Sequence, residues 1–488
     1  MYDVVIIGGG PAGSTTASML KKYNPSLNVL ILEREKFPRE HVGESQLPPI
    51  GPILDEMGCW EKVEAADFPI KIGATFRWGN TKDLWDFQLF PPSMFEDKPR
   101  PNKFEGQRKF TPWQVERAIY DQILLEHSKS MGAEVREETK VTKINRDGDR
   151  ITSIEIETGE VIEGRYYVDG SGSSGFMRRA MGIDIVEPSS LRNVAIWDYW
   201  TDTDWAYSIG TGGTRILVLS IGYGWIWFIP VGKTRTSIGF VCPAEYYKNS
   251  GLSKEELYMK ALGDEPKIQE LTKAAGRENV VRATRDWSYY SERMHGENWF
   301  LIGEAAGFAD PILSAGLTMA HLSGKELAYT IMALDEGKMD AEWLKSELSE
   351  NQARRVKQHI QFADFWYTAN GCFTDCKEYT SLIAKEAGMT LNAHDAFQWF
   401  GSGGFIHENM GAGFSGCEFD TMKDTIEVMT QTEAELECQK YNHFTLNLEG
   451  ATVEEFAYYE EGKIYPIKRW RRGNETLPQS GMYYVIVQ

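Results

Sequence analysis

The first forty residues carry a pattern of apolar and polar positions that predicts a βαβ unit. A continuous apolar run at residues 2–7 predicts a buried parallel strand, and a Gly-rich turn at residues 8–13 leads into a helix over about 14–23. The next apolar run, at residues 28–32, predicts a second strand, which ends at Glu33. This order of elements is typical of a nucleotide-binding sheet.

Farther along, the pattern predicts a return to this sheet and then a second sheet. Residues 161–169 are expected to rejoin the first sheet, whereas residues 193–241 alternate apolar and polar positions over long strands separated by turns. That alternation predicts an antiparallel lobe. Residues 299–303 are strand-like again, and a long helix is expected from about 316 to 334.

Beyond residue 340 the chain becomes acidic and its pattern predicts a helical cap. A Gly-rich break at residues 401–413 interrupts this region, and it suits either a lid or a surface loop. The sequence therefore predicts three parts. They are a discontinuous nucleotide-binding domain (1–190 and 280–340), an antiparallel substrate lobe (191–279) and a helical cap (341–488).

Composition narrows the class of protein. The chain has 488 residues, 42% of them hydrophobic and 25% charged, which describes a globular protein with a large core. The net charge of −19 argues against a nucleic-acid or anionic-membrane partner, and no apolar run approaches the ~20 residues of a membrane span. The chain passes from Met1 directly into a strand, and its six cysteines are scattered along the sequence. We therefore expect a cytoplasmic location, and we expect no metal site.

The turn at residues 8–13 has the spacing of a dinucleotide-binding loop. Gly8 permits the tight turn, Gly10 lets the backbone approach a pyrophosphate, and Gly13 lets the helix lie close to the strand. The free N–H groups of the helix N-terminus then face the phosphates. Glu33 follows Gly13 at the distance where an acid accepts hydrogen bonds from ribose hydroxyls.

Three features favour FAD over NAD as the cofactor. The glycine motif lies at the extreme N-terminus, residues 169–172 (DGSG) end a later strand with a second Gly turn, and residues 303–311 (GEAAGFADP) provide a third. A second complete G-x-G-x-x-G unit is absent from the sequence. The sequence thus predicts a fold in the α/β class, with an FAD-binding Rossmann-like domain of the aromatic-hydroxylase kind. It also predicts that a separate NAD(P)H-dependent flavin reductase supplies reduced flavin.

Residues 225–230 read W-x-W-x-I-P. Trp225, Trp227, Ile229 and Pro230 would form a rigid apolar wall between a flavin and the place where a substrate is modified. Taken alone, the hexapeptide is equally typical of an ordinary buried strand, because Trp, Phe and Ile favour strands.

Together these motifs resemble a flavin-dependent halogenase over roughly residues 1–345. The resemblance rests on the glycine loop, on residues 41–45 (HVGES), on Lys71 within IKIG, on the W-x-W-x-I-P wall and on residues 303–317. It implies that the following residues contact FAD: Gly8, Gly9, Gly10, Ala12, Gly13, Glu33, Arg39, Val42, Glu44, Arg117, Val141, Asp310 and Leu317.

The resemblance also implies a reaction. FADH₂ and O₂ would oxidise chloride or bromide to hypohalous acid, with the halide held by the backbone N–H groups of Ala315 and Gly316, where the family has Ser or Thr in place of the Ala. The acid would travel to Lys71, which makes the halogen electrophilic as an ammonium or as a chloramine. The alternative is a Lys71 whose head reaches solvent from a strand end.

One departure from the family bears on the substrate. Tryptophan halogenases carry a Glu where this chain has Leu313, and the Glu stabilises the cationic intermediate on an indole. A phenol or pyrrole needs less help, so the resemblance implies such a ring, free or tethered to an acyl or peptidyl carrier protein. The basic run at residues 468–472 suits either a carrier contact or a solvated turn.

Two other flavoprotein functions remain open at this stage. An FAD-dependent aromatic hydroxylase would oxidise NAD(P)H directly and have no use for Lys71. A prenyl-reductase-like flavoprotein shares the FAD motifs and a similar aromatic wall, but it would need a lipid-shaped cavity. Ile229, Lys71 and residues 41–45 favour the halogenase.

Overall fold

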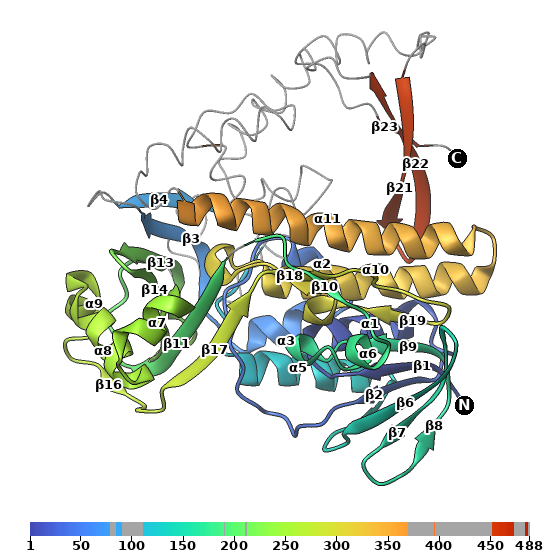
Figure 1. The fold of residues 1–488 in the computed structure, drawn as a ribbon, viewed down its shortest axis with the longest axis horizontal. Coiled ribbons are helices and arrows are strands. Elements are labelled where there is room, and N and C mark those ends of the chain that lie inside the picture. The colour runs from blue at the N-terminus through green and yellow to red at the C-terminus, as the bar shows by residue number, and fades with distance from the viewer. Residues whose placement is uncertain are drawn as a thin grey trace.

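The computed structural model describes residues 1–78, 84–89, 111–189, 191–209, 212–368, 395, 451–472 and 484–486. The Gly-rich segment 401–413 lies outside these residues. Figure 1 shows two sheet-based lobes side by side, with two long helices running along one edge of both. Within the described residues, no helix has the length and apolar composition needed to cross a bilayer.

The first lobe contains the predicted parallel sheet. Its five strands run in the order β19-β9-β1-β2-β5, and every neighbouring pair is parallel. The strands are β1 (Tyr2–Ile7), β2 (Val29–Leu32), β5 (Glu134–Arg136), β9 (Gly164–Asp169) and β19 (Trp299–Leu301). The parallel sheet of the predicted α/β fold is thereby confirmed.

Alternation along β1 assigns the two faces of this sheet. Val4 and Ile6 belong to the core shared with the helices, whereas Val5 and Ile7 belong to the core of the opposite face. The helices are α1 (Pro11–Tyr23), α2 (Ile50–Glu56), α3 (Trp60–Ala65), α5 (Arg117–Ser130) and α10 (Gly316–Glu336). The opposite face is covered by β6 (Val141–Asp147), β7 (Arg150–Ile156), β8 (Val161–Ile162) and α6 (Phe176–Ala180).

The second lobe is a nine-stranded sheet. Seven strands run in the order β16-β11-β15-β14-β13-β3-β4, and β12 and β17 pair with β13 and β11. The strands are β3 (Ile70–Arg77), β4 (Trp85–Gln88), β11 (Arg192–Thr201), β12 (Ser208–Ile209), β13 (Gly213–Ile221), β14 (Gly224–Pro230), β15 (Arg235–Pro243), β16 (Gly276–Arg277) and β17 (Arg282–Trp287). The predicted antiparallel pattern holds for residues 192–243, while β3 joins β13 in parallel.

This sheet differs from the sequence-based division in its membership. Residues 70–88 and 282–287 fall in the ranges assigned to the nucleotide-binding part, yet they form β3, β4 and β17 of the second sheet. The physical reason is that long-range pairing, here β3 with β13 and β17 with β11, completes a sheet from segments distant in sequence. No local pattern carries that information.

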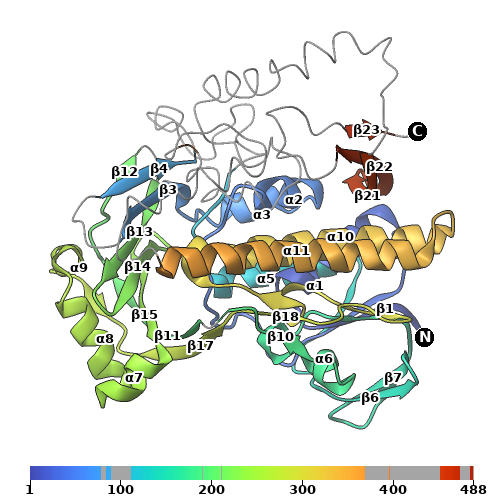
Figure 2. The ribbon, with the colours of Figure 1, turned by 45° about the horizontal axis from the view of Figure 1, so that its top comes forward.

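Side chains along β14 alternate between two environments. Ile226 and Phe228 lie in the core shared with three helices, α7 (Ala244–Ser250), α8 (Lys254–Gly263) and α9 (Pro266–Leu271). Figures 1 and 2 show these helices on the outer side of the lobe. Trp225, Trp227 and Ile229 therefore face the other lobe.

The C-terminal region contains one predicted helix and an unpredicted sheet. Helix α11 (Ala341–Thr368) lies beside α10, as both views show, whereas β21 (Ala451–Glu460), β22 (Lys463–Arg472) and β23 (Tyr484–Ile486) form a three-stranded antiparallel sheet. The predicted helical character is wrong for residues 451–472. Thr, Val, Phe and Tyr favour strands there, and Gly462 has a φ of +80° in the turn.

Candidate active site

A cavity of about 790 Å³ lies between the two lobes. Its lining comes from the glycine loop, residues 39–45, the inner face of β11, β13 and β14, and the start of α10. The predicted site residues on its wall are Gly8, Gly10, Ala12, Glu33, Arg39, Val42, Glu44, Arg117, Val141, Trp225, Trp227, Ile229, Gly316 and Leu317. Those not on the wall are Gly9, Gly13, Lys71, Pro230, Asp310 and Ala315.

The glycine loop is shaped by close backbone approach. Gly8 has a φ of +104°, and a Cβ there would lie 2.4 Å from the carbonyl oxygen of Gly170. A Cβ on Gly13 would lie 2.1 Å from the carbonyl oxygen of Gly8. The Glu33 carboxylate accepts a hydrogen bond from Gly9 N at 2.8 Å and still faces the cavity. This arrangement of glycines, helix N-terminus and acid fits the dinucleotide part of FAD.

Arg117 ties α5 to the loop that crosses the cavity. Its guanidinium makes a bidentate pair with Asp121, both contacts at 2.8 Å, and donates to the carbonyl oxygens of Val42 and Gly43. Arg39 also contacts Asp121, at 3.0 Å. The Arg117 guanidinium holds the pKa of the buried Asp121 carboxyl below its ordinary value, against the effect of burial. The resemblance implies that Arg39 and Arg117 contact FAD, and both line the cavity.

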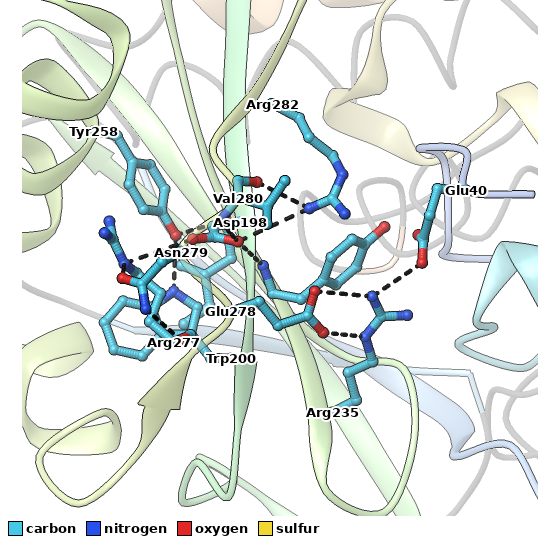
Figure 3. Close-up of polar contacts among 12 residues, drawn as sticks. Glu40, Asp198, Trp200, Arg235, Tyr258, Arg277, Glu278, Asn279, Val280 and Arg282 are labelled. Atoms are coloured by element: carbon cyan, nitrogen blue, oxygen red, sulfur yellow. Dashed lines mark hydrogen bonds and ion pairs between the residues drawn. The ribbon is translucent and has the colours of Figure 1, made fainter.

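The same loop, residues 40–46, is also held from the second lobe. Arg235 on β15 pairs with Glu40 of the loop, with Glu116 and with Glu278, and Figure 3 shows its guanidinium between Glu40 and Glu278. The guanidinium lies 3.8 Å from the centre of the Tyr199 ring. These ion pairs therefore join β15 to the 40–46 loop and to α5.

Glu44 is a buried acid on the cavity wall. Its Oε1 atom has no hydrogen-bond partner among the described residues, and the nearby Tyr199 and Ser237 only partly oppose the effect of burial on its pKa. Burial raises the pKa of Glu44 to about 7. A carboxyl group with this pKa exchanges a proton near neutral pH.

Trp225 and Trp227 form the aromatic part of the wall on β14. Trp227 fits against Gly239, where a Cβ would lie 2.1 Å from the indole, and its Nε1 donates to Ser237. Trp225 Nε1 donates to the hydroxyl of Tyr367 on α11 at 2.8 Å. Tyr367 in turn donates to Asp310, which places α11 against the loop that precedes α10.

Helix α10 begins at the cavity. Ala315 is its N-cap residue and is fully buried, and Gly316 and Leu317 lie on the cavity wall. The first N–H groups of an α-helix have no partner within the helix, and the helix dipole adds positive potential there. Because Ser314 adopts a φ of +58°, the chain turns sharply into this N-terminus. The arrangement can hold an anion beside the flavin position.

Lys71 does not reach solvent. It lies within β3, its side chain is 2% exposed, and its Nζ donates to the carbonyl oxygen of Gln46 at 2.9 Å. Burial lowers the pKa of Lys71 to about 7, so ammonium and free amine coexist near neutral pH. Glu44 and Ser45 line the cavity, and Lys71 contacts Gln46, the next residue of the same loop.

We expect Lys71→Met to stabilise the fold more at pH 7 than near pH 10. Between about 7 and its ordinary value of 10.5, the unfolded chain binds a proton that the folded Lys71 does not. The unfavourable contribution is complete below pH 7 and fades as pH rises, with a slope approaching about 1.4 kcal/mol per unit. Melting temperatures of both proteins across this range measure the difference. A difference that does not change with pH would contradict the shifted pKa.

Sequence reasoning did not single out Gln46, Gln114, Tyr199 or Arg235. Gln46 holds Lys71 through a backbone carbonyl, which has no signature in the sequence. Arg235 lies on β15, and its ion-pair partner Glu40 becomes its neighbour only when the two lobes meet. Tyr199 is linked to the same ion pair through its contact with the Arg235 guanidinium.

The chain matches a family model described as an FAD binding domain over residues 1–363. It is 32% identical over 392 residues to the 1H-pyrrole-2-carbonyl-[peptidyl-carrier protein] chlorinase of Pseudomonas fluorescens, covering 76% of this chain and 85% of that protein. It is also 32% identical to the tryptophan 2-halogenase of Chondromyces crocatus, over 69% of this chain and 62% of that protein.

Similarity extends to solved structures. The myxobacterial chondrochloren halogenase CndH, a variant of FAD-dependent halogenases, superposes with a TM-score of 0.67 at 28% identity. The match covers 84% of this chain and 97% of that protein.

Proposed function

The chain belongs to the flavin-dependent halogenases, which are FAD-dependent oxidoreductases, and from this we propose that it halogenates an electron-rich phenol or pyrrole through Lys71. The observation that carries the proposal is the position of Lys71. It is a buried lysine, outside the large cavity but hydrogen-bonded to the loop that forms its wall. A lysine in this position can act on a reagent that forms in the cavity and reacts with the substrate outside it.

The cavity residues suit the first half of the reaction. The glycine loop, Glu33, Arg39 and Arg117 would hold the dinucleotide, and Leu317 would lie against the flavin ring. Reduced FAD, when bound, supplies the activation of O₂ that oxidises a halide to hypohalous acid. The N-terminus of α10 at Ala315 and Gly316 would bind chloride or bromide, because backbone N–H groups need no particular side chain.

Lys71 suits the second half. As an ammonium it donates a hydrogen bond to the oxygen of hypohalous acid and so makes the halogen more electrophilic. As a free amine it exchanges one N–H for an N–halogen bond, and the proton leaves with the hydroxide as water. In either form the ring carbon gains the halogen and loses a proton. The pKa of Lys71, about 7, makes both forms accessible.

A phenol or pyrrole is favoured over free tryptophan by Leu313, where the tryptophan halogenases have a Glu. The similarity to a chlorinase named for a pyrrole carried on a peptidyl-carrier protein supports a tethered substrate as well as a free one. We also propose that reduced flavin comes from a separate NAD(P)H-dependent reductase, because the sequence has one complete dinucleotide loop.

Mass spectrometry of a reconstituted reaction tests the proposal. The mixture contains the protein, FAD, a flavin reductase, NADH, O₂ and bromide, with phenols and pyrroles supplied free and as carrier-protein thioesters. We expect a product in which one hydrogen is replaced by bromine, and only when halide is present. A product that gains only oxygen, whether or not halide is present, would instead favour an aromatic hydroxylase.

A further inference from the structure

Three chain segments meet beside Lys71 and form a small sheet. Ser45 lies opposite Gln114, and Ile70 lies opposite Trp113, in two antiparallel bridges. The backbone bonds around each bridge show that both pairs are of the non-hydrogen-bonded type, in which side chains approach most closely. Residues 44–46, 112–115 and 69–71 are therefore adjacent in that order.

Alternation along these segments places three polar side chains on one face. Ser45 is directly opposite Gln114, so their side chains share a face. Lys71 is opposite Pro112, two residues before Gln114, which makes Lys71 and Gln114 diagonal neighbours on that face. Diagonal neighbours have backbones about 7–8 Å apart, within reach of long side chains.

Two of these side chains are buried without a partner. Gln114 is 0% exposed, and neither its Oε1 nor its Nε2 has a hydrogen-bond partner among the described residues. Ser45 is 5% exposed, and its Oγ also has no hydrogen-bond partner among the described residues. Burying an unpaired amide or hydroxyl costs about 1–3 kcal/mol. Several such groups in one place are explained by a ligand or an ordered water that pairs with them.

The location of these groups indicates which ligand they serve. Ser45 lines the cavity together with Gly316 and Leu317, while Lys71 contacts the adjacent Gln46. Gln114 stands between Ser45 and Lys71 in the small sheet. The hydroxyl of Ser45 and the amide of Gln114 therefore lie in that order between the cavity wall and Lys71.

We propose that Ser45 and Gln114 form a polar relay that receives hypohalous acid at the cavity wall and holds it for Lys71. Hypohalous acid is a small molecule that both donates and accepts hydrogen bonds. The Gln114 amide has one acceptor and two donor positions, and the Ser45 hydroxyl is also both donor and acceptor. The relay rests on the proposed halogenation and adds the residues that keep its oxidant from escaping.

Gln114→Met tests the relay, because methionine keeps the length of the side chain and removes its polar atoms. Product is measured by mass spectrometry, and free hypohalous acid is trapped with monochlorodimedone. We expect the amount of halogenated product formed for each molecule of reduced FAD oxidised to fall about tenfold. This factor corresponds to the loss of one hydrogen bond to the oxidant. Trapped hypohalous acid should rise. The melting temperature should not fall, because the lost amide has no hydrogen-bond partner among the residues that the structure describes.

Ser45→Ala provides a second variant, with Ser18→Ala as its matched control. Ser18 lies on α1, is 0% exposed and also has an unpartnered Oγ, but it does not line the cavity. We expect Ser45→Ala to release more hypohalous acid than the wild type. Ser18→Ala should release the same amount as the wild type.

Two results would overturn the relay in different ways. If the wild type halogenates and Gln114→Met and Ser45→Ala keep its ratio of product to trapped oxidant, the amide and hydroxyl are ordinary buried groups and the proposed function stands. If the wild type forms neither product nor trapped oxidant while it oxidises reduced FAD, the proposed function itself fails.

Discussion

Lys71→Met is expected to reduce halogenation by about 100-fold or more while oxidation of reduced FAD continues. Removal of one group that positions a proton or stabilises developing charge typically costs 10²–10⁴-fold. The flavin site should survive, because Lys71 does not line the cavity and the replacement fills the same space. Parallel assays of bromide incorporation, by mass spectrometry, and of flavin oxidation, by absorbance, give the two rates.

Lys21→Met is the matched control for this experiment. Lys21 is also buried, at 9% exposure, and its Nζ donates to the carbonyl oxygens of Pro25 and Leu27. Both substitutions remove a buried ammonium group that donates to backbone carbonyl oxygens, so they remove hydrogen bonds of the same kind. Halogenation that falls equally in the two variants would assign a structural role to Lys71 and remove it from the chemistry.

Gly13→Ala is expected to weaken FAD binding about 10- to 100-fold and to lower the melting temperature. The new Cβ would lie 2.1 Å from the carbonyl oxygen of Gly8, a backbone atom that moves only if α1 shifts away from β1. Overpacking of this kind costs about 1–3 kcal/mol, and each 1.4 kcal/mol is tenfold in affinity. A fluorescence titration of the protein with FAD measures the change.

Gly263→Ala serves as the control, because a Cβ on this residue of α8 meets nothing within 4 Å. It should bind FAD as the wild type does. If Gly13→Ala binds FAD with wild-type affinity, the loop tolerates a displaced α1. FAD affinity would then depend little on the position of that helix.

The nucleotide-binding unit was predictable because its signals are local. The strand at residues 2–7, the spacing of Gly8 and Gly13 and the acid at Glu33 all lie within one βαβ unit, where periodicity and steric limits act over a few residues. The W-x-W-x-I-P segment likewise alternates along one strand, so its period of two places Trp225, Trp227 and Ile229 on one face.

The cap was the weakest prediction from sequence. The pattern predicts a helical cap over residues 341–488, but residues 451–472 form a hairpin whose pairing satisfies the backbone. Strand preference depends on what a segment packs against, so composition alone does not decide between the two.

The sequence by itself determined the FAD-binding loop, the apolar wall and the identity of the candidate lysine, because each depends on residue type and near spacing. Only the tertiary structure decided what surrounds them. Pairing of β3 with β13 buries Lys71, and bridges among residues 44–46, 112–115 and 69–71 bring Ser45 and Gln114 beside it. These contacts join segments more than twenty residues apart, where only long-range packing fixes burial, pKa and the partners of polar atoms.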